Sequence, residues 1–93
     1  MNRVLLRSNA FLRTAKKIVK RNASLASQIE TALELLAHDA FDPALQTHKL
    51  SGELAGSWAC SAGYDLRIVF SFVTHQNTEA ILLETIGTHD EVY

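Results

Sequence analysis

The chain has 93 residues, of which 47% are hydrophobic and 20% are charged. This composition is ordinary for one small soluble domain with a single modest core, and it argues against disorder and against a second domain. The longest aliphatic runs, such as Ala80–Leu83, are far shorter than the roughly 20 residues that a membrane-spanning helix needs. The run Val4–Leu6 is too short for the core of a signal peptide, so we expect a cytoplasmic protein with no membrane partner.

Charge is divided sharply along the chain, although the formal net charge is only −1. Seven of the nine basic residues lie in the first 21 positions, whereas all ten acidic residues lie at position 30 or later. Such asymmetry is typical of a surface that faces a polyanion, and a solvated helix face is the plainer alternative. Cys60 is the single cysteine, which excludes an intrachain disulfide and a cysteine-based zinc site. We expect it to be a small buried residue.

The first half of the chain has the pattern of a strand followed by two helices. Residues 3–7 form a short apolar run between two arginines, as in a strand. Ser8 is a suitable cap for a helix over residues 9–21, where apolar side chains recur every three or four positions. The basic side chains of this helix fall largely on its other face; they are Arg13, Lys16, Lys17, Lys20 and Arg21. Asn22 or Ser24 begins a second helix that reaches about Asp39 and pairs with the first as a hairpin.

Pro43 ends this second helix, and β-branched and aromatic residues then indicate a sheet. Residues 45–56 contain two glycines and are expected to form a loop that leads into a strand near residues 57–61. Residues 64–74 alternate, with Leu66, Ile68, Phe70 and Phe72 on one face and Asp65, Arg67, Val69 and Ser71 on the other. After a turn at residues 75–78, residues 79–86 are apolar on both faces, as in a central strand. The predicted fold is α+β in the order β-α-α-β-β-β, with the helical hairpin packed on a small, mainly antiparallel sheet.

Strand geometry brings three polar residues toward one end of this sheet. Asp65 and Arg67 share a strand face, which taken alone is also the pattern of a solvated surface. If the last two strands form an antiparallel hairpin, His89 follows the end of one strand and lies beside Asp65 at the start of the other. His48 precedes the sheet in a loop beside Lys49, and its side chain could fold over the same face.

These residue types fit RNA cleavage without a metal. Two histidines can act as base and acid near neutral pH, an arginine can hold a phosphate, and a carboxylate can orient or deprotonate. Three histidines with a carboxylate could also bind zinc, but no H-x-H or H-x-x-x-H spacing places two ligands on one element, so we expect no metal. Gly52-x-x-x-Gly56 lacks the lysine and hydroxyl residue of a phosphate-binding loop, and no other cofactor is expected.

Four segments carry a resemblance to a known group of proteins. They are His48-Lys49-Leu50-x-Gly52, Gly56-Ser57-Trp58-Ala59-Cys60, Gly63-Tyr64-Asp65-Leu66-Arg67-Ile68-Val69-Phe70 and Gly87-Thr88-His89-Asp90-Glu91-Val92-Tyr93. Together with the basic helical hairpin, they resemble the RelE/ParE toxin superfamily, and most closely its YafQ-type mRNA interferases. The resemblance covers nearly the whole chain. Its most specific part is Gly-Thr-His followed by an aromatic residue four positions after the histidine.

The resemblance implies a ribosome-dependent endoribonuclease toxin of a type II toxin–antitoxin module. Such a toxin cuts translated mRNA and is neutralised by a cognate antitoxin protein, with which it can form a hetero-oligomer. Carried over by motif, the catalytic residues are His48, Asp65 and His89, and the substrate-binding residues are Arg67, Lys49 and Tyr93. The segment 61–63 lacks the histidine that YafQ-type toxins carry shortly before the aspartate. Either Asp65 or His48 is therefore the general base, and His89 is the general acid.

In this chemistry the 2′-hydroxyl attacks the adjacent phosphate, and the enzyme protonates the leaving 5′-oxygen. The positive side chains would offset charge on the phosphate, Tyr93 would stack on or orient a nucleotide, and the basic helix would face ribosomal or messenger RNA. A ParE-like toxin that inhibits DNA gyrase by protein binding is the alternative, but it has no chemical use for the two histidines and Asp65. A third possibility is an inactive toxin retained for binding its antitoxin or operator.

Overall fold

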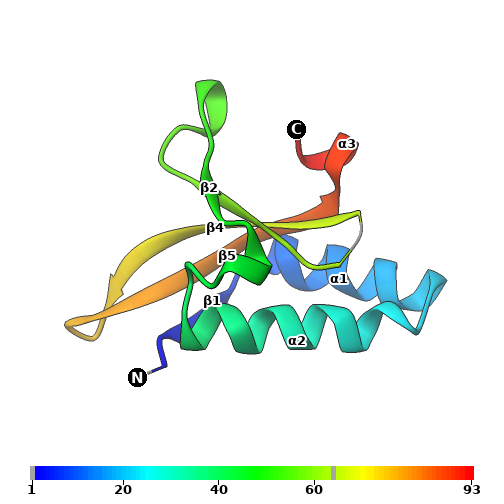
Figure 1. Cartoon of the computed structure of the whole chain (residues 1–93), viewed down its shortest axis with the longest axis horizontal. Helices are drawn as coiled ribbons and strands as arrows, with labels where there is room; N and C mark the ends of the chain where they lie inside the picture. Colours follow the sequence, from blue (N-terminus) through cyan, green and yellow to red (C-terminus); the bar gives the residue numbers. More distant parts are fainter. Residues whose placement is uncertain (1, 64) are drawn as a thin grey trace.

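The computed structural model describes residues 2–63 and 65–93. Its helices and strands are β1 (Val4–Arg7), α1 (Asn9–Arg21), α2 (Leu25–His38), β2 (His48–Lys49), β3 (Trp58–Ser61), β4 (Leu66–His75), β5 (Thr78–Thr88) and α3 (His89–Val92), with two short 3-10 turns, η1 (Pro43–Leu45) and η2 (Gly52–Leu54). The helices α1 and α2 lie together on one side of a five-stranded sheet (Figure 1). The predicted α+β class, with a helical hairpin on a sheet, is confirmed.

The sheet has the strand order β1-β5-β4-β3-β2. β5 pairs in parallel with β1, and all the other pairs are antiparallel, so the sheet is mainly antiparallel as predicted. β5 lies between β1 and β4, so it is an interior strand of the sheet. Gln76 and Asn77 connect β4 to β5 with φ values of 52° and 62°, the left-handed conformation of a type I′ turn, whose twist matches that of the two strands. The predicted start of the β4 strand at Tyr64 lies outside the described residues.

Three segments differ from the sequence-based expectation. Residues 45–56, expected to be a loop, contain β2 and the turn η2, and residues 89–92 form α3. β2 has only two residues, so no periodicity in the sequence could reveal it; it exists because His48 and Lys49 pair with Ala59 and Trp58 of β3. β5 also continues to Thr88, beyond the expected end at Ile86, because its partner β4 continues alongside it.

Serine residues occupy the cap positions at the starts of α1 and α2. The predicted cap at Ser8 is confirmed, because its Oγ accepts a hydrogen bond of 3.0 Å from the Phe11 amide of α1. The same hydroxyl donates to the carbonyl of Glu84 in β5 at 2.9 Å, which anchors the start of the basic helix on the sheet. Ser24 occupies the cap position of α2, while its hydroxyl donates to Asn22 Oδ1 at 2.6 Å.

The hydrophobic core lies between the two long helices and the sheet. Leu66, Ile68 and Phe70 of β4 are buried in it, and Phe72 packs against it, so the apolar face predicted for this strand is confirmed. The helices contribute Phe11, Ile29, Ala32, Leu33 and Leu36 to the same cluster. The opposite face of the sheet carries Arg67 and Ser71 and is not covered by α1 or α2 (Figure 1). Among residues 2–63 and 65–93, no helix combines the length and apolar character needed to cross a bilayer.

Burial of Cys60 gives a first testable prediction. Its side chain is fully buried, and desolvation raises the pKa of the thiol to about 12, because a thiolate is disfavoured away from water. We therefore expect Cys60 to resist a thiol-reactive disulfide reagent at pH 8 in the folded protein and to react fully in guanidinium chloride. Release of the coloured leaving group measures both rates. Rapid labelling of the folded chain would show that the thiol is accessible.

Candidate active site

A notch of about 470 Å³ opens between β2, the segment that follows it, and α3. We call it the β2–α3 notch, and its lining residues are His48, Lys49, Leu50, Ser51, Leu54, His89 and Tyr93. The β2 segment and α3 both stand on the side of the sheet away from the long helices (Figure 1). Four of the predicted site residues thus meet in one place, although 40 residues of sequence separate His48 from His89.

The η1 turn positions His48. Asp42 begins the turn, because its carboxylate accepts a hydrogen bond of 2.9 Å from the Ala44 amide, and Gln46 ends it with a left-handed φ of 52°. In this conformation the Gln46 carbonyl lies 3.0 Å from Nδ1 of His48. A carbonyl only accepts, so in the neutral imidazole Nδ1 carries the hydrogen and Nε2 is the acceptor.

The other imidazole nitrogen of His48 contacts Tyr93. The Tyr93 hydroxyl lies 2.9 Å from Nε2, and it must be the donor to a neutral His48. Partial burial raises the pKa of the Tyr93 phenol, although the positive charge of Arg67 opposes the rise. The hydroxyl is therefore protonated at neutral pH and can donate. The Tyr93 ring also packs edge-on against His89, with the ring centroids 4.6 Å apart.

A single helical turn, α3, presents His89 and Tyr93 to the notch. Thr88 Oγ1 accepts from the Glu91 amide at 3.3 Å, and the Glu91 carboxylate accepts from the Thr88 amide at 2.8 Å. This reciprocal pair is a capping box, and the hydrogen bonds from Thr88 hold the pKa of Glu91 below its usual value. Gly87 lets α3 fold back onto β5, because a Cβ there would lie 3.2 Å from Glu91 Cβ and 3.3 Å from Val92 Cγ1.

Asp65 lies at the end of the sheet but outside the notch. The His89 amide donates to the Asp65 carbonyl at 3.1 Å, so the two residues are main-chain neighbours, as the antiparallel hairpin predicts. The Asp65 side chain is exposed, and it is not one of the described side chains that line the notch. Asp65 precedes the first residue of β4, so the expectation that it shares a strand face with Arg67 does not apply to it.

Of the two predicted phosphate-binding cations, Lys49 lines the notch and Arg67 does not. Arg67 lies in register between Ser61 and Gly87, and its Nη1 donates to the Leu66 carbonyl at 2.9 Å. Its positive charge opposes the rise in the pKa of the Tyr93 phenol. The Lys49 ammonium lies 5.5 Å from the centroid of the Trp58 ring, a cation–π contact that holds it at the rim.

The five basic residues of α1 are all exposed, as the amphipathic pattern predicts: Arg13, Lys16, Lys17, Lys20 and Arg21. Lys17 and Arg21 also line a groove of about 430 Å³ whose far wall includes Thr88 and Glu91. The positive face of α1 therefore extends to the turn that carries His89.

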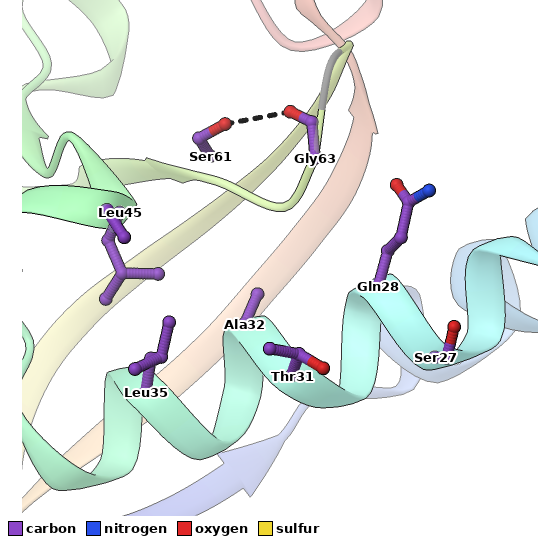
Figure 2. A pocket seen from close by; sticks show the side chains of 9 residues that line it. Ser27, Gln28, Thr31, Ala32, Leu35, Leu45, Ser61 and Gly63 are labelled. Atoms are coloured by element: carbon purple, nitrogen blue, oxygen red, sulfur yellow. Dashed lines mark hydrogen bonds between the residues drawn. The ribbon is translucent and has the colours of Figure 1, made fainter.

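A second pocket lacks the groups that catalysis would need. It has a volume of about 280 Å³ and lies between α2 and the connection from β3 to β4 (Figure 2). Leu35 and Leu45 point toward one another across it, and Ser61 Oγ donates to the Gly63 carbonyl at 2.9 Å. The nine described residues that line it include no charged side chain and no histidine. Within the described part of the chain, no group of three or more His, Cys, Asp and Glu side chains is placed to hold a metal ion.

Sequence reasoning missed part of the site. Leu50, Ser51 and Leu54 line the β2–α3 notch, and nothing in their spacing indicates this. The α3 turn could have been found, because Thr88-x-x-Glu91 has the sequence signature of a capping box.

Solved structures of small bacterial toxins have the same fold as this chain. YafQ from Escherichia coli strain BL21(DE3) is 15% identical, with 98% of each chain covered and a TM-score of 0.76. The E. coli DinJ–YafQ complex gives 18% identity, 98% coverage of each chain and a TM-score of 0.76. The YoeB/ParE toxin from Agrobacterium tumefaciens gives 15% identity and a TM-score of 0.74, with 92% of this chain and 98% of that chain covered.

The family itself follows from the sequence. Residues 3–93 match the family model described as "Bacterial toxin of type II toxin-antitoxin system, YafQ", and the chain belongs to this family. The resemblance to YafQ-type toxins in the RelE/ParE superfamily is thereby confirmed. A search of curated protein sequences finds no significant match.

Proposed function

We propose that this type II toxin is a ribosome-dependent endoribonuclease that cuts translated mRNA by metal-independent attack of the 2′-hydroxyl. The observation that carries the proposal is the convergence of two imidazoles, His48 and His89, on the β2–α3 notch from different elements of the fold. A base and an acid that titrate near neutral pH are what this reaction requires. The aromatic ring of Tyr93 contacts both imidazoles.

His48 is the preferred general base. Its Nε2 lies in the notch and is the accepting nitrogen of the neutral ring, so it can take the proton of the 2′-hydroxyl. Asp65 remains the second candidate for this role, because it lies beside the main chain of His89. His89 then protonates the leaving 5′-oxygen, and its exposed side chain can reach a bound nucleotide.

Three further side chains have roles in binding. Arg67 and Lys49 offset the charge of the crowded phosphate, and Tyr93 stacks on or orients a nucleotide, since an aromatic face accepts any base. The exposed basic residues of α1 bind ribosomal or messenger RNA phosphates. A net charge of −1 predicts weak binding to free RNA, so the ribosome supplies much of the affinity. We therefore propose that the toxin acts in the cytoplasm, where translation occurs.

The neutralising partner is a cognate antitoxin protein. In the DinJ–YafQ complex a YafQ chain of the same fold is bound to DinJ. We propose that this chain assembles with its own antitoxin in a toxin–antitoxin hetero-oligomer. The exposed apolar side chains Val4, Leu12 and Phe41 offer surface that a partner could cover.

The decisive experiment adds the purified toxin to a translating extract and maps cleavage by primer extension. We expect cuts in translated mRNA, and no cleavage of the same RNA without ribosomes at physiological salt. A parallel supercoiling assay tests the gyrase alternative. Inhibition of gyrase without RNA cleavage would overturn the proposal, and so would strong cutting of naked RNA. Harmless expression without an antitoxin would instead identify an inactive toxin.

A further inference from the structure

We propose that the Tyr93 hydroxyl is a positioning group that holds His48 in the tautomer with an accepting Nε2, and that the Thr88–Glu91 capping box keeps Tyr93 in place. The catalytic consequence rests on the proposed function, whereas the positioning itself does not. The proposal assigns to the hydroxyl a role separate from the stacking that any aromatic ring could provide.

The His48 ring is held at both nitrogens. Nδ1 lies 3.0 Å from the Gln46 carbonyl, and Nε2 lies 2.9 Å from the Tyr93 hydroxyl. A neutral imidazole has one donor and one acceptor, so these two partners together select the form with hydrogen on Nδ1. In water a neutral imidazole prefers the other tautomer. Removing the hydroxyl therefore removes one of the two contacts that oppose this preference.

The hydroxyl occupies the position on Nε2 that a ribose hydroxyl would take. Both groups donate an O–H to the same lone pair, so substrate binding exchanges one donor for another and leaves the tautomer unchanged. The free site is thus preorganised for accepting a proton. The same contact competes weakly with the substrate, so its loss should not weaken substrate binding.

Tyr93 can hold His48 only if α3 is ordered. A single turn of helix has little stability of its own, because nucleation is costly. The capping box supplies two hydrogen bonds, the Tyr93 amide donates to the His89 carbonyl at 3.1 Å, and Glu91 packs on Gly87. Glu91 is therefore a positioning residue that acts on His48 through Thr88, the α3 turn and Tyr93.

Ring ¹⁵N chemical shifts of the full chain test the positioning without reference to activity. We expect His48 in the wild type to show hydrogen on Nδ1, and Tyr93→Phe to shift it toward the Nε2 form while His38 and His75 stay unchanged. Glu91→Ala should shift His48 in the same direction, and Glu91→Gln, which keeps an accepting oxygen, should restore much of the wild-type spectrum. Glu34→Gln on the exposed face of α2 is the matched control. Identical His48 shifts in wild type and Tyr93→Phe would overturn the proposal.

Kinetics on translating ribosomes test the consequence. Without the hydroxyl, part of the protein should bind substrate with hydrogen on Nε2 of His48, a form that cannot take the proton. The kcat of Tyr93→Phe should therefore fall by about 2- to 10-fold, with no rise in KM. In the Glu91→Ala background, the further Tyr93→Phe change should have little effect, because both changes break the same chain of contacts. Additive losses of kcat in the double variant, or a rise in KM alone, would contradict the positioning role of Tyr93. A wild type that cuts no RNA would refute the proposed function, while the ¹⁵N shifts would still decide the positioning.

Discussion

Replacing His89 by alanine should lower the rate of mRNA cleavage on translating ribosomes by about 10²- to 10⁴-fold, the usual loss for a general acid or base. The imidazole lines the β2–α3 notch, and 57% of its side chain is exposed, so the loss should come from chemistry rather than from unfolding. Alanine is a strong helix former, and position 89 is the first residue of α3, so the turn should persist. The rate of a single turnover is the quantity to measure.

Two controls separate the acid role of His89 from its packing against Tyr93. His75→Ala removes an exposed histidine at the end of β4 and should leave the rate unchanged. His89→Gln retains a polar side chain of similar length but cannot supply a proton, so it should be nearly as slow as His89→Ala. Added imidazole should partly restore His89→Ala, because the exposed notch can admit it. A wild-type rate in His89→Ala would exclude the proposed acid.

Replacing Phe70 by alanine should lower the free energy of unfolding by about 3–5 kcal/mol. Phe70 is among the largest fully buried side chains. It lies in the middle of β4, in the hydrophobic cluster that both long helices form with β4 and β5. Its removal leaves a cavity that the packed strands cannot close. Since small domains are stable by only about 5–15 kcal/mol, the variant should retain a small part of its stability.

Urea unfolding followed by the fluorescence of Trp58, the only tryptophan, measures this change. Leu12→Ala is the matched control, because Leu12 is 50% exposed on α1, and we expect a change within about 0.5 kcal/mol. Phe70→Leu should fall between the two, since leucine fills part of the cavity. Equal losses in Phe70→Ala and Leu12→Ala would contradict the placement of the core.

The repeating patterns of the sequence were sufficient for the framework of the fold. The period of α1 and the alternation in β4 predicted which faces are buried, because these patterns arise from burial of one face of each element. The Ser8 cap could also be predicted from the sequence, since a cap depends on residues within one helical turn. The same local logic would have found α3 from Thr88-x-x-Glu91. Local interactions depend on residues that are close in the sequence, so they can be predicted without a structure.

The candidate site depended on tertiary structure. The sequence identified His48, His89 and Tyr93 as suitable residue types, but the hydrogen bond between Tyr93 and His48 joins residues 45 positions apart. That contact arises from the pairing of β2 with β3, the left-handed Gln46 and the packing of α3 on Gly87. Asp65 does not line the notch and lies before the first residue of β4, so strand alternation could not predict the direction of its side chain. The sequence alone thus determined the long helices and the main strands, their buried faces and the family. Only the tertiary structure decided which polar groups come into contact, because those contacts depend on the register between distant segments.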